Sequence, residues 1–349
     1  MTRTLVVRLD NAGDVLLAGP AVRAAAAGSD HLTVLAGPNG SAAARLLEGV
    51  DDVLEWTCPW IAPDADPVDA LEITALVERL AGRRFDKALV LTSFHQSPLP
   101  TALLLRLAGV RWVGAISEDY PGSLLDLRHR VAGDLPEAER ALSLALAAGF
   151  ELPEGDDGSL RVRRPLPDVS HLVPTTPYVV LHPGTSVPAR AWPVERFAET
   201  RRMLEDTGWT VVVTGAPGEK SLTELVCDGT AAVDLAGRTS LDELAAVLDR
   251  AAAVVVANTG PAHLAAAVGT PVVSLFAPTV PAARWAPYRV PRVLLGDQDA
   301  VCRDTRVTRC PFPGHPCLTP VTAADVLRAV EKLCGCVGSD HRGRLAEEV

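Results

Sequence analysis

The chain has 349 residues, of which 48% are hydrophobic and 22% are charged, and its formal net charge is −10. This length suits two globular domains, each long enough to bury a core. The acidic balance argues against a nucleic-acid partner, which would need a basic face.

Three features predict a cytoplasmic protein. The first apolar run, Leu5–Val7, is interrupted by Arg8 and Asp10, unlike a secretory signal. No run reaches the roughly 18 apolar residues that a membrane helix needs. The seven cysteines cannot all pair within the chain, which fits a reducing compartment.

Short apolar runs alternate with alanine-rich segments along the whole chain, which is typical of parallel α/β sheets. The strands expected in the first half are Thr4–Leu9, Leu32–Ala36, Asp52–Thr57, Lys87–Thr92 and Trp112–Ile116. The helices expected there are Asp14–Ala27, Ser41–Glu48, Val68–Ala81, Pro98–Ala108 and Pro136–Ala148. The proline- and glycine-rich stretch Glu151–Pro177 then predicts a linker or hinge.

The same alternation fills the second half. Its expected strands are Tyr178–His182, Thr210–Thr214, Val233–Leu235, Ala253–Ala257, Pro271–Phe276 and Val293–Leu295. Its expected helices are Val194–Thr207, Lys220–Cys227, Leu241–Arg250, Ala262–Val268 and Ala323–Leu333, with a capping box between Ser240 and Glu243. We therefore expect domains at 1–165 and 166–335 and a flexible tail at 336–349, with a ligand cleft between the two domains.

The turn Asn11-Ala-Gly-Asp14 joins the first strand to the first helix. Because ligands bind at the carboxyl edge of open α/β sheets, Asp14 is a candidate catalytic base and Gly13 a candidate ligand contact. The alternative is that Gly13 only forms the turn and Asp14 only complements the helix N-terminus.

Two loops of the second half have the residues of a diphosphate site. Leu181–Ser186 supplies backbone N–H groups and the hydroxyls of Thr185 and Ser186, and Arg190 follows with a guanidinium. The alternative is an ordinary loop with Pro193 at the first helical position, but such a loop has no need of the charge on Arg190.

The second loop, Ala257–Leu264, opens a short helix at Gly260, with Thr259 and His263 one helical turn apart. We interpret it as another phosphate-binding loop, although a lone histidine is more often structural.

Two other motifs are weaker. The run Gly215–Ser221 is not a P-loop, because two residues rather than four separate its glycines and Glu219 precedes the lysine. Glu219 either contacts a ribose or lies in a surface turn. Cys302, Cys310 and Cys317, with His315 nearby, lack the close cysteine pair of structural zinc sites, so we expect free thiols there and no metal.

Taken together, Arg8–Pro20, His182–Phe197 and Val254–Pro278 resemble the ADP-heptose:lipopolysaccharide heptosyltransferases of glycosyltransferase family 9. The last stretch, VVVANTGPAHLAAAVGTPVVSLFAP, is the most specific. The resemblance implies the GT-B fold, an α/β arrangement of two Rossmann-like domains with parallel sheets facing a central cleft. It implies an acceptor on the first domain, a nucleotide-sugar on the second, and an inverting transfer without metal or cofactor.

Carried onto this chain, the resemblance assigns Asp14 as the base that takes a proton from the acceptor hydroxyl. The residues it assigns to the donor and its diphosphate are Thr185, Ser186, Arg190, Thr259, Gly260 and His263. Asn258 stands where the family usually has Asp, so heptose is expected from the resemblance alone. Asn258, Glu219 and Gly13 are the further residues expected to contact the sugar or nucleoside.

The expected donor is thus a nucleotide-diphospho-sugar, by resemblance ADP-heptose. The expected acceptor is a glycolipid such as lipopolysaccharide core, another glycan or a glycoside, with peripheral contact to the inner membrane face for a lipid. Two alternatives stay open, a nucleotide-sugar epimerase of the same architecture and a non-catalytic nucleotide-sugar-binding protein. The sequence does not indicate an oligomeric state.

Overall fold

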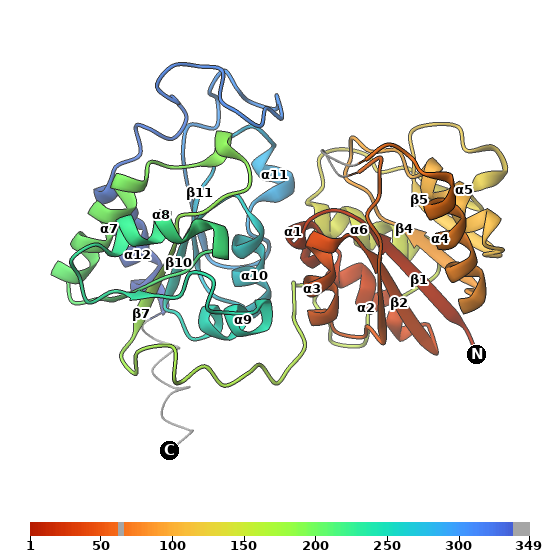
Figure 1. Cartoon of the computed structure of the whole chain (residues 1–349), viewed down its shortest axis with the longest axis horizontal. Helices are drawn as coiled ribbons and strands as arrows, with labels where there is room; N and C mark the ends of the chain where they lie inside the picture. The colour runs from red at the N-terminus through yellow and green to blue at the C-terminus, as the bar shows by residue number, and fades with distance from the viewer. Residues whose placement is uncertain (62–65, 338–349) are drawn as a thin grey trace. The chain divides into compact units, whose positions relative to one another are not determined.

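The computed structural model describes residues 1–61 and 66–337, and it divides the chain into two compact units, 1–163 and 164–349 (Figure 1). Each unit is built on a six-stranded parallel sheet. Residues 338–349, which carry most of the predicted tail, lie outside the described part.

The N-terminal unit has the strand order β3-β2-β1-β4-β5-β6. The strands are β1 (Arg3–Arg8), β2 (His31–Ala36), β3 (Asp52–Glu55), β4 (Lys87–Val90), β5 (Trp112–Ile116) and β6 (Leu127–His129). The helices are α1 (Ala12–Leu17), α2 (Gly19–Ala27), α3 (Pro38–Leu46), α4 (Ala70–Arg83), α5 (Leu99–Leu107) and α6 (Glu137–Ala147), with a short 3₁₀ turn, η1, at Gly122–Leu124. Since β1 pairs with both β2 and β4, the order of the strands reverses at β1, and this is where α/β sheets bind ligands.

The C-terminal unit repeats this plan with the order β12-β11-β10-β7-β8-β9. The strands are β7 (Tyr178–His182), β8 (Thr210–Val213), β9 (Val233–Asp234), β10 (Ala253–Ala257), β11 (Val272–Leu275) and β12 (Arg292–Leu295). The helices are α7 (Val194–Asp206), α8 (Lys220–Cys227), α9 (Leu241–Asp249), α10 (Gly260–Val268), α11 (Ala282–Trp285) and α12 (Ala323–Val337), with 3₁₀ turns η2 (Pro188–Arg190) and η3 (Pro217–Glu219). Here the reversal lies at β7, between β8 and β10.

The hydrophobic pattern predicted most of these elements to within a few residues, and the Ser240–Glu243 capping box is confirmed. The single helix predicted at Asp14–Ala27 is wrong, because the chain forms α1 and α2 with a break at Ala18. Pro20 explains the break, since it has no N–H and its ring clashes with the carbonyl of the preceding helical turn.

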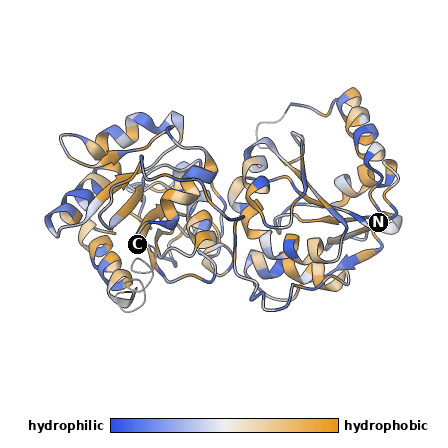
Figure 2. Ribbon diagram, turned by 90° about the horizontal axis from the view of Figure 1, so that it is seen from below, coloured by the Kyte–Doolittle hydropathy of each residue, from blue (hydrophilic) through white to orange (hydrophobic). Residues whose placement is uncertain are grey.

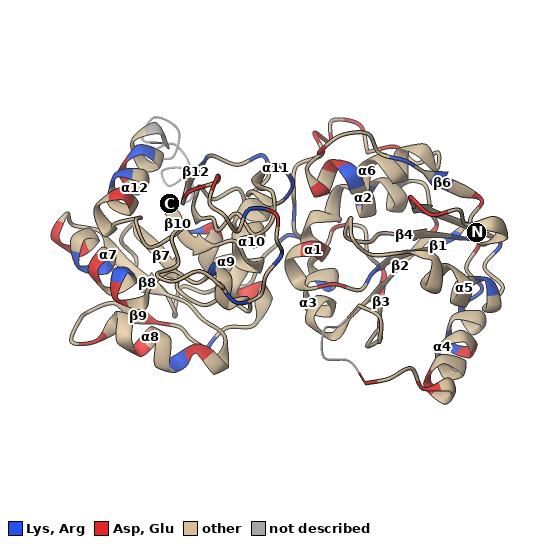
Figure 3. Cartoon of the chain, turned by 90° about the horizontal axis from the view of Figure 1, so that it is seen from above, with Lys and Arg blue, Asp and Glu red and all other residues tan. Residues whose placement is uncertain are grey.

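Each unit has its own hydrophobic core between sheet and helices. Hydrophobic residues follow the strands and the inner helix faces (Figure 2), and the central strands β1, β7 and β10 are almost wholly buried. Acidic and basic residues are interspersed along α4 and α7 (Figure 3). In the part of the chain that the structure describes, no helix is long and apolar enough to span a bilayer.

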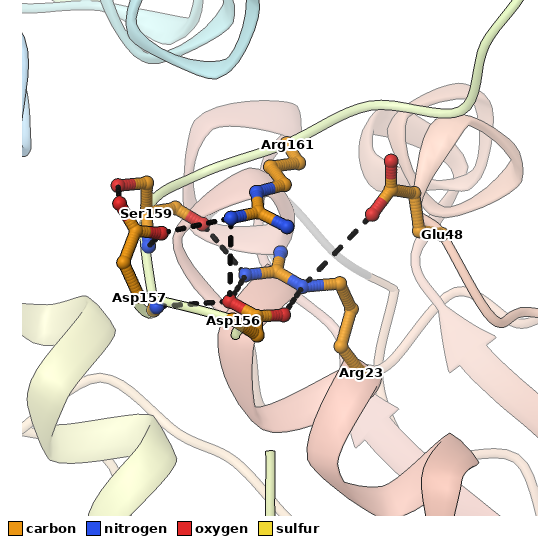
Figure 4. A network of polar contacts seen from close by, with 7 residues as sticks. Arg23, Glu48, Asp156, Asp157, Ser159 and Arg161 are labelled. Carbon is orange, nitrogen blue, oxygen red and sulfur yellow. Dashed lines mark hydrogen bonds and ion pairs between the residues drawn. The ribbon is translucent and has the colours of Figure 1, made fainter. Parts of the chain in front are cut away.

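The boundary between the two units, at residues 163 and 164, lies within the predicted linker Glu151–Pro177, and each part of this segment packs on one unit. Its first part packs on the N-terminal unit, where Arg23 of α2 holds Asp156 by two hydrogen bonds of 2.6 and 2.9 Å (Figure 4). Its second part packs on the C-terminal unit, where the guanidinium of Arg164 donates one hydrogen bond to each carboxylate oxygen of Asp249. Buried side chains such as Leu160 and Val169 anchor both parts, so each half belongs to one unit.

Candidate functional site

The N-terminal unit gathers charged side chains at the carboxyl ends of β1 and β4. Arg8 is the last residue of β1, and Asp10 and Asp14 follow it in the turn and the first turn of α1. Ser93 and Gln96 come from the loop after β4. These two loops meet because β1 and β4 are parallel neighbours in the sheet.

Arg8 is the centre of this cluster. Its Nη2 atom lies 3.0 Å from Asp14 Oδ1 and donates to Ser93 Oγ at 3.0 Å, and its Nε atom lies 3.1 Å from Asp10 Oδ2. Gln96 Nε2 donates to the other Asp10 oxygen at 2.6 Å. The side chains of Arg8 and Asp10 are only 4% and 10% exposed, whereas that of Asp14 is 21% exposed. Asp14 is therefore the member of the cluster that faces a ligand or solvent.

Burial and charge oppose each other in this cluster. Burial alone would lower the pKa of Arg8, but Asp10, Asp14 and Glu137 outweigh it and hold that pKa above its ordinary value. Burial raises the pKa of Asp10; Arg8 opposes this rise and Asp14 adds to it. Arg8 thus stays charged between two acids of different exposure.

A second charged pair, Glu137 and Arg140, lies on α6. Glu137, at the start of α6, is buried and lies 3.5 Å from Arg140. Arg140 also donates to the carbonyl oxygen of Thr92, after β4, at 2.6 Å. This contact ties α6 to the edge that carries Ser93.

In the C-terminal unit, the carboxyl ends of β7 and β10 bring the two predicted donor loops together. Arg190, at the end of η2, donates from Nη1 to the carbonyl oxygen of Asn258 at 3.1 Å. These residues are 68 positions apart, so the contact comes from the pairing of β7 with β10. Arg190 thus lies beside Thr259 and the start of α10, as the diphosphate prediction requires.

In this second loop three polar atoms are buried and have no hydrogen-bond partner among the described residues: Asn258 Nδ2, Thr259 Oγ1 and His263 Nδ1. Burial, with a smaller contribution from Arg190, lowers the pKa of His263 to about 4. His263 is therefore neutral at physiological pH. Buried polar atoms are normally satisfied, so three on one loop beside an arginine indicate a place for a polar ligand.

Glu219 lies across the first loop. Its carboxylate accepts from the backbone N–H of Ala216 at 2.7 Å and packs on Gly184, where any Cβ atom would overlap it. It is 3.9 Å from His182, whose other ring nitrogen bonds the Thr214 hydroxyl at 2.9 Å. Burial lowers the pKa of His182, and Glu219 opposes that change. Glu219 is thus part of the carboxyl edge of the C-terminal sheet and not of an isolated surface turn.

The remaining predicted residues are placed as follows. Thr185 forms a small turn, its hydroxyl accepting from the N–H of Val187 at 3.2 Å, and Ser186 is exposed. Gly260 is the first residue of α10, and Gly13 is buried within α1.

The loop that carries Cys302, Cys310, Cys317 and His315 contacts the turn before Arg190. His315 Nε2 donates to the Ala189 carbonyl at 3.0 Å, and the Ala189 N–H donates to Thr308 at 2.9 Å, so this loop holds the turn that carries Arg190. Cys302 and Cys317 are buried in the hydrophobic core, where burial and the neighbouring Cys302 raise the pKa of Cys317 to about 12. Among the described residues, no three histidine, cysteine or acidic side chains are grouped to hold a metal ion.

Sequence reasoning missed several residues of these edges, namely Arg8, Asp10, Ser93, Gln96, Glu137, Arg140, His182 and His315. Arg8 and Asp10 carried a usable signal, because charged residues directly after a buried strand lie at the ligand-binding edge. The others depend on contacts between segments far apart in the sequence.

Comparison with known proteins places this geometry in context. The family model described as glycosyltransferase family 9 (heptosyltransferase) matches residues 73–315. Lipopolysaccharide heptosyltransferase 1 of Salmonella typhimurium is 28% identical over 236 residues, which is 66% of this chain and 71% of that protein.

Two solved structures have the same fold. A glycosyltransferase family 9 protein of Veillonella parvula aligns with a TM-score of 0.74 at 18% identity, covering 95% of this chain and 97% of that one. An E. coli heptosyltransferase solved with ADP-2-deoxy-2-fluoro heptose aligns with a TM-score of 0.70 at 22% identity, covering 95% and 99%. The fold is therefore GT-B, with a Rossmann-like unit in each half.

Proposed function

The chain belongs to glycosyltransferase family 9, and we propose that it transfers heptose from ADP-heptose to a hydroxyl group of a lipopolysaccharide-type acceptor. The observation that carries the proposal lies at the carboxyl edge of the C-terminal sheet, which we call the donor edge. There Arg190 lies beside three buried polar atoms, on Asn258, Thr259 and His263, that have no hydrogen-bond partner among the described residues. A sugar diphosphate supplies the oxygen atoms that such a group would bind.

The reaction that we propose is a single displacement with inversion at the anomeric carbon. Asp14 accepts the proton of the acceptor hydroxyl while the oxygen of that hydroxyl attacks the anomeric carbon. The bond between the anomeric carbon and the diphosphate oxygen breaks, and both of its electrons stay on that oxygen. ADP then leaves with the added negative charge. Arg190 and the N-terminus of α10 stabilise that charge, which is how we propose the enzyme dispenses with a metal ion.

The donor sugar is bound, in this proposal, beside Asn258 and Glu219. Asn258 is 3% exposed, and its amide can donate as well as accept. A heptose offers hydroxyl groups that satisfy either role. The acceptor belongs to the N-terminal unit and, if it is lipid-linked, brings the enzyme to the inner face of the membrane.

Chromatography of reactions with ADP-heptose tests this proposal. With a lipopolysaccharide-core acceptor lacking heptose, we expect equal amounts of ADP and heptosylated acceptor, and the product should have the opposite anomeric configuration. With ADP-heptose alone we expect neither ADP nor an isomer of the donor. An isomer formed without acceptor would instead favour the epimerase, and donor binding with no turnover on a panel of glycolipids would favour a binding protein.

The metal-free mechanism has its own test. Activity should persist after dialysis against EDTA, with the buffer kept free of divalent ions. A loss of activity that added Mg²⁺ or Mn²⁺ restores would contradict this part of the proposal.

A further inference from the structure

The acid proposed as the base does not stand alone. Asp14 Oδ1 is held at 3.0 Å by Arg8, and no hydrogen bond reaches Asp14 Oδ2 from the residues that the structure describes. Arg8 is in turn fixed by Asp10 at 3.1 Å and by Ser93 at 3.0 Å. The guanidinium therefore orients one oxygen of Asp14 and leaves the other for a substrate.

The balance of charge in this cluster matters for a base. A carboxylate paired with an arginine alone is stabilised in its ionised form, which makes it a weaker proton acceptor. Here a second, more deeply buried carboxylate, Asp10, shares the same guanidinium. Gln96 fixes Asp10 by a hydrogen bond of 2.6 Å, so Asp10 stays in place beside Arg8.

We propose that Arg8 and Asp10 are positioning residues for Asp14: Arg8 sets the direction of the carboxylate, and Asp10 offsets the charge of Arg8 so that Asp14 can still accept a proton. This inference rests on the proposed function, because it assumes that Asp14 is the base. It assigns a task in the reaction to two residues buried too deeply to bind the acceptor themselves.

Other charged groups face the same cluster and complete the electrostatic picture. Glu137 of α6 acts on Arg8, and His95, from the loop after β4, acts on Asp10. Arg140 lies 3.5 Å from Glu137 and compensates its charge. Because these groups stay unchanged in single variants at positions 8 and 10, the effects of those variants report on the Arg8–Asp10–Asp14 contacts.

The test is the pH dependence of kcat in Asp10→Asn, Arg8→Lys and Arg8→Gln, with Asp14→Asn measured alongside. In Asp10→Asn the full charge of Arg8 acts on the proposed base, so the acidic limb of the kcat profile should move to lower pH and kcat should fall several-fold. In Arg8→Gln the limb should move to higher pH. Arg8→Lys should keep the limb near its original place but lower kcat, with the donor KM unchanged.

The matched control is Asp52→Asn, which removes another aspartate–arginine pair of the same unit, with Arg83, from the start of β3. Its profile should equal that of the parent enzyme. Circular dichroism checks that each variant folds. If Arg8→Gln does not fold, the proposal is tested by comparing the position of the acidic limb in Asp10→Asn with its position in Arg8→Lys.

The outcomes separate the two claims. If Asp14→Asn keeps its turnover, the proposed base is wrong. If Asp14→Asn is inactive but the acidic limb of Asp10→Asn stays at the parent position, Asp14 remains the base and the positioning role of Arg8 and Asp10 is refuted.

Discussion

The two carboxyl edges of this protein have the same topology but opposite polar character. In the N-terminal unit the edge is an ion cluster, with Arg8 bound to Asp10 and Asp14. In the C-terminal unit the edge has Arg190 and a loop with buried polar atoms on Asn258, Thr259 and His263. These atoms have no hydrogen-bond partner in the part of the chain that the structure describes.

The two edges differ in where their polar side chains find their partners. The charged groups of the first edge form ion pairs with one another, which hold the Asp14 carboxylate in place. In the proposed function a ligand supplies the partners of the polar groups of the second edge, so its binding should stabilise the folded protein. Substitutions at the first edge should therefore change the rate of transfer, and substitutions at the second should change donor affinity and stability.

The largest expected effect is that of Asp14→Asn. The amide keeps the size of the carboxylate but cannot take the proton, so kcat should fall by about 10²–10⁴-fold. Calorimetric titration with ADP should give the parent affinity, because Asp14 belongs to the N-terminal unit. A parallel loss of ADP binding would contradict the proposal that the N-terminal edge acts in the transfer step and the C-terminal edge binds the donor.

The next effect is on stability and depends on pH. His263 has an ordinary pKa near 6.5, and burial holds it at about 4 in the folded protein. The unfolded chain thus binds a proton that the folded chain excludes, so stability should fall as the pH drops from about 6.5 to about 4, by up to about 3 kcal/mol. Denaturant titrations of His263→Gln should lack this part of the loss.

The matched control for that measurement is His171→Gln, an exposed histidine of the same unit. It should keep the pH dependence of the parent protein. If His263→Gln also keeps all of it, His263 is not the group responsible.

A smaller effect is expected for Arg190→Ala. Loss of a charged hydrogen-bond donor costs about 1.5–3 kcal/mol, so the Kd for ADP should rise about 10- to 100-fold. Arg190→Lys should recover part of the affinity, because it keeps the charge but loses the two-pronged geometry. Arg196→Ala, which removes a partly exposed arginine paired with Glu199 on α7, should bind ADP normally.

The smallest effect is expected for Gly184→Ala. The new methyl group displaces the Glu219 carboxylate and breaks its bond to Ala216, while the protein still folds because the end of a side chain can move. The Kd for ADP should rise a few-fold, in line with a lost hydrogen bond of about 1 kcal/mol. Gly218→Ala, with open space around its Cβ position, should leave binding unchanged, and an equal effect of both would remove Glu219 from the donor edge.

The sequence predicted the elements well where burial alone defines them, as in β7 and β10. It failed at β6, because Leu127–His129 is a short edge strand of half-buried residues without an apolar run. The two loops predicted to bind the donor follow β7 and β10 as expected, since glycine and proline at strand ends are local signals. The Arg8–Ser93 and Arg190–Asn258 contacts join residues 85 and 68 positions apart, so only the pairing of strands reveals them.

The Arg23–Asp156 contact has a practical consequence for dividing the protein. A fragment that ends after α6 contains Arg23 but not Asp156, and the arginine, 5% exposed, would lose a carboxylate that is itself 4% exposed. A buried charge without its partner costs about 3–5 kcal/mol, a large part of the stability of a small domain. An N-terminal fragment should therefore extend past Asp156, and the compact unit of residues 1–163 includes this part of the predicted linker.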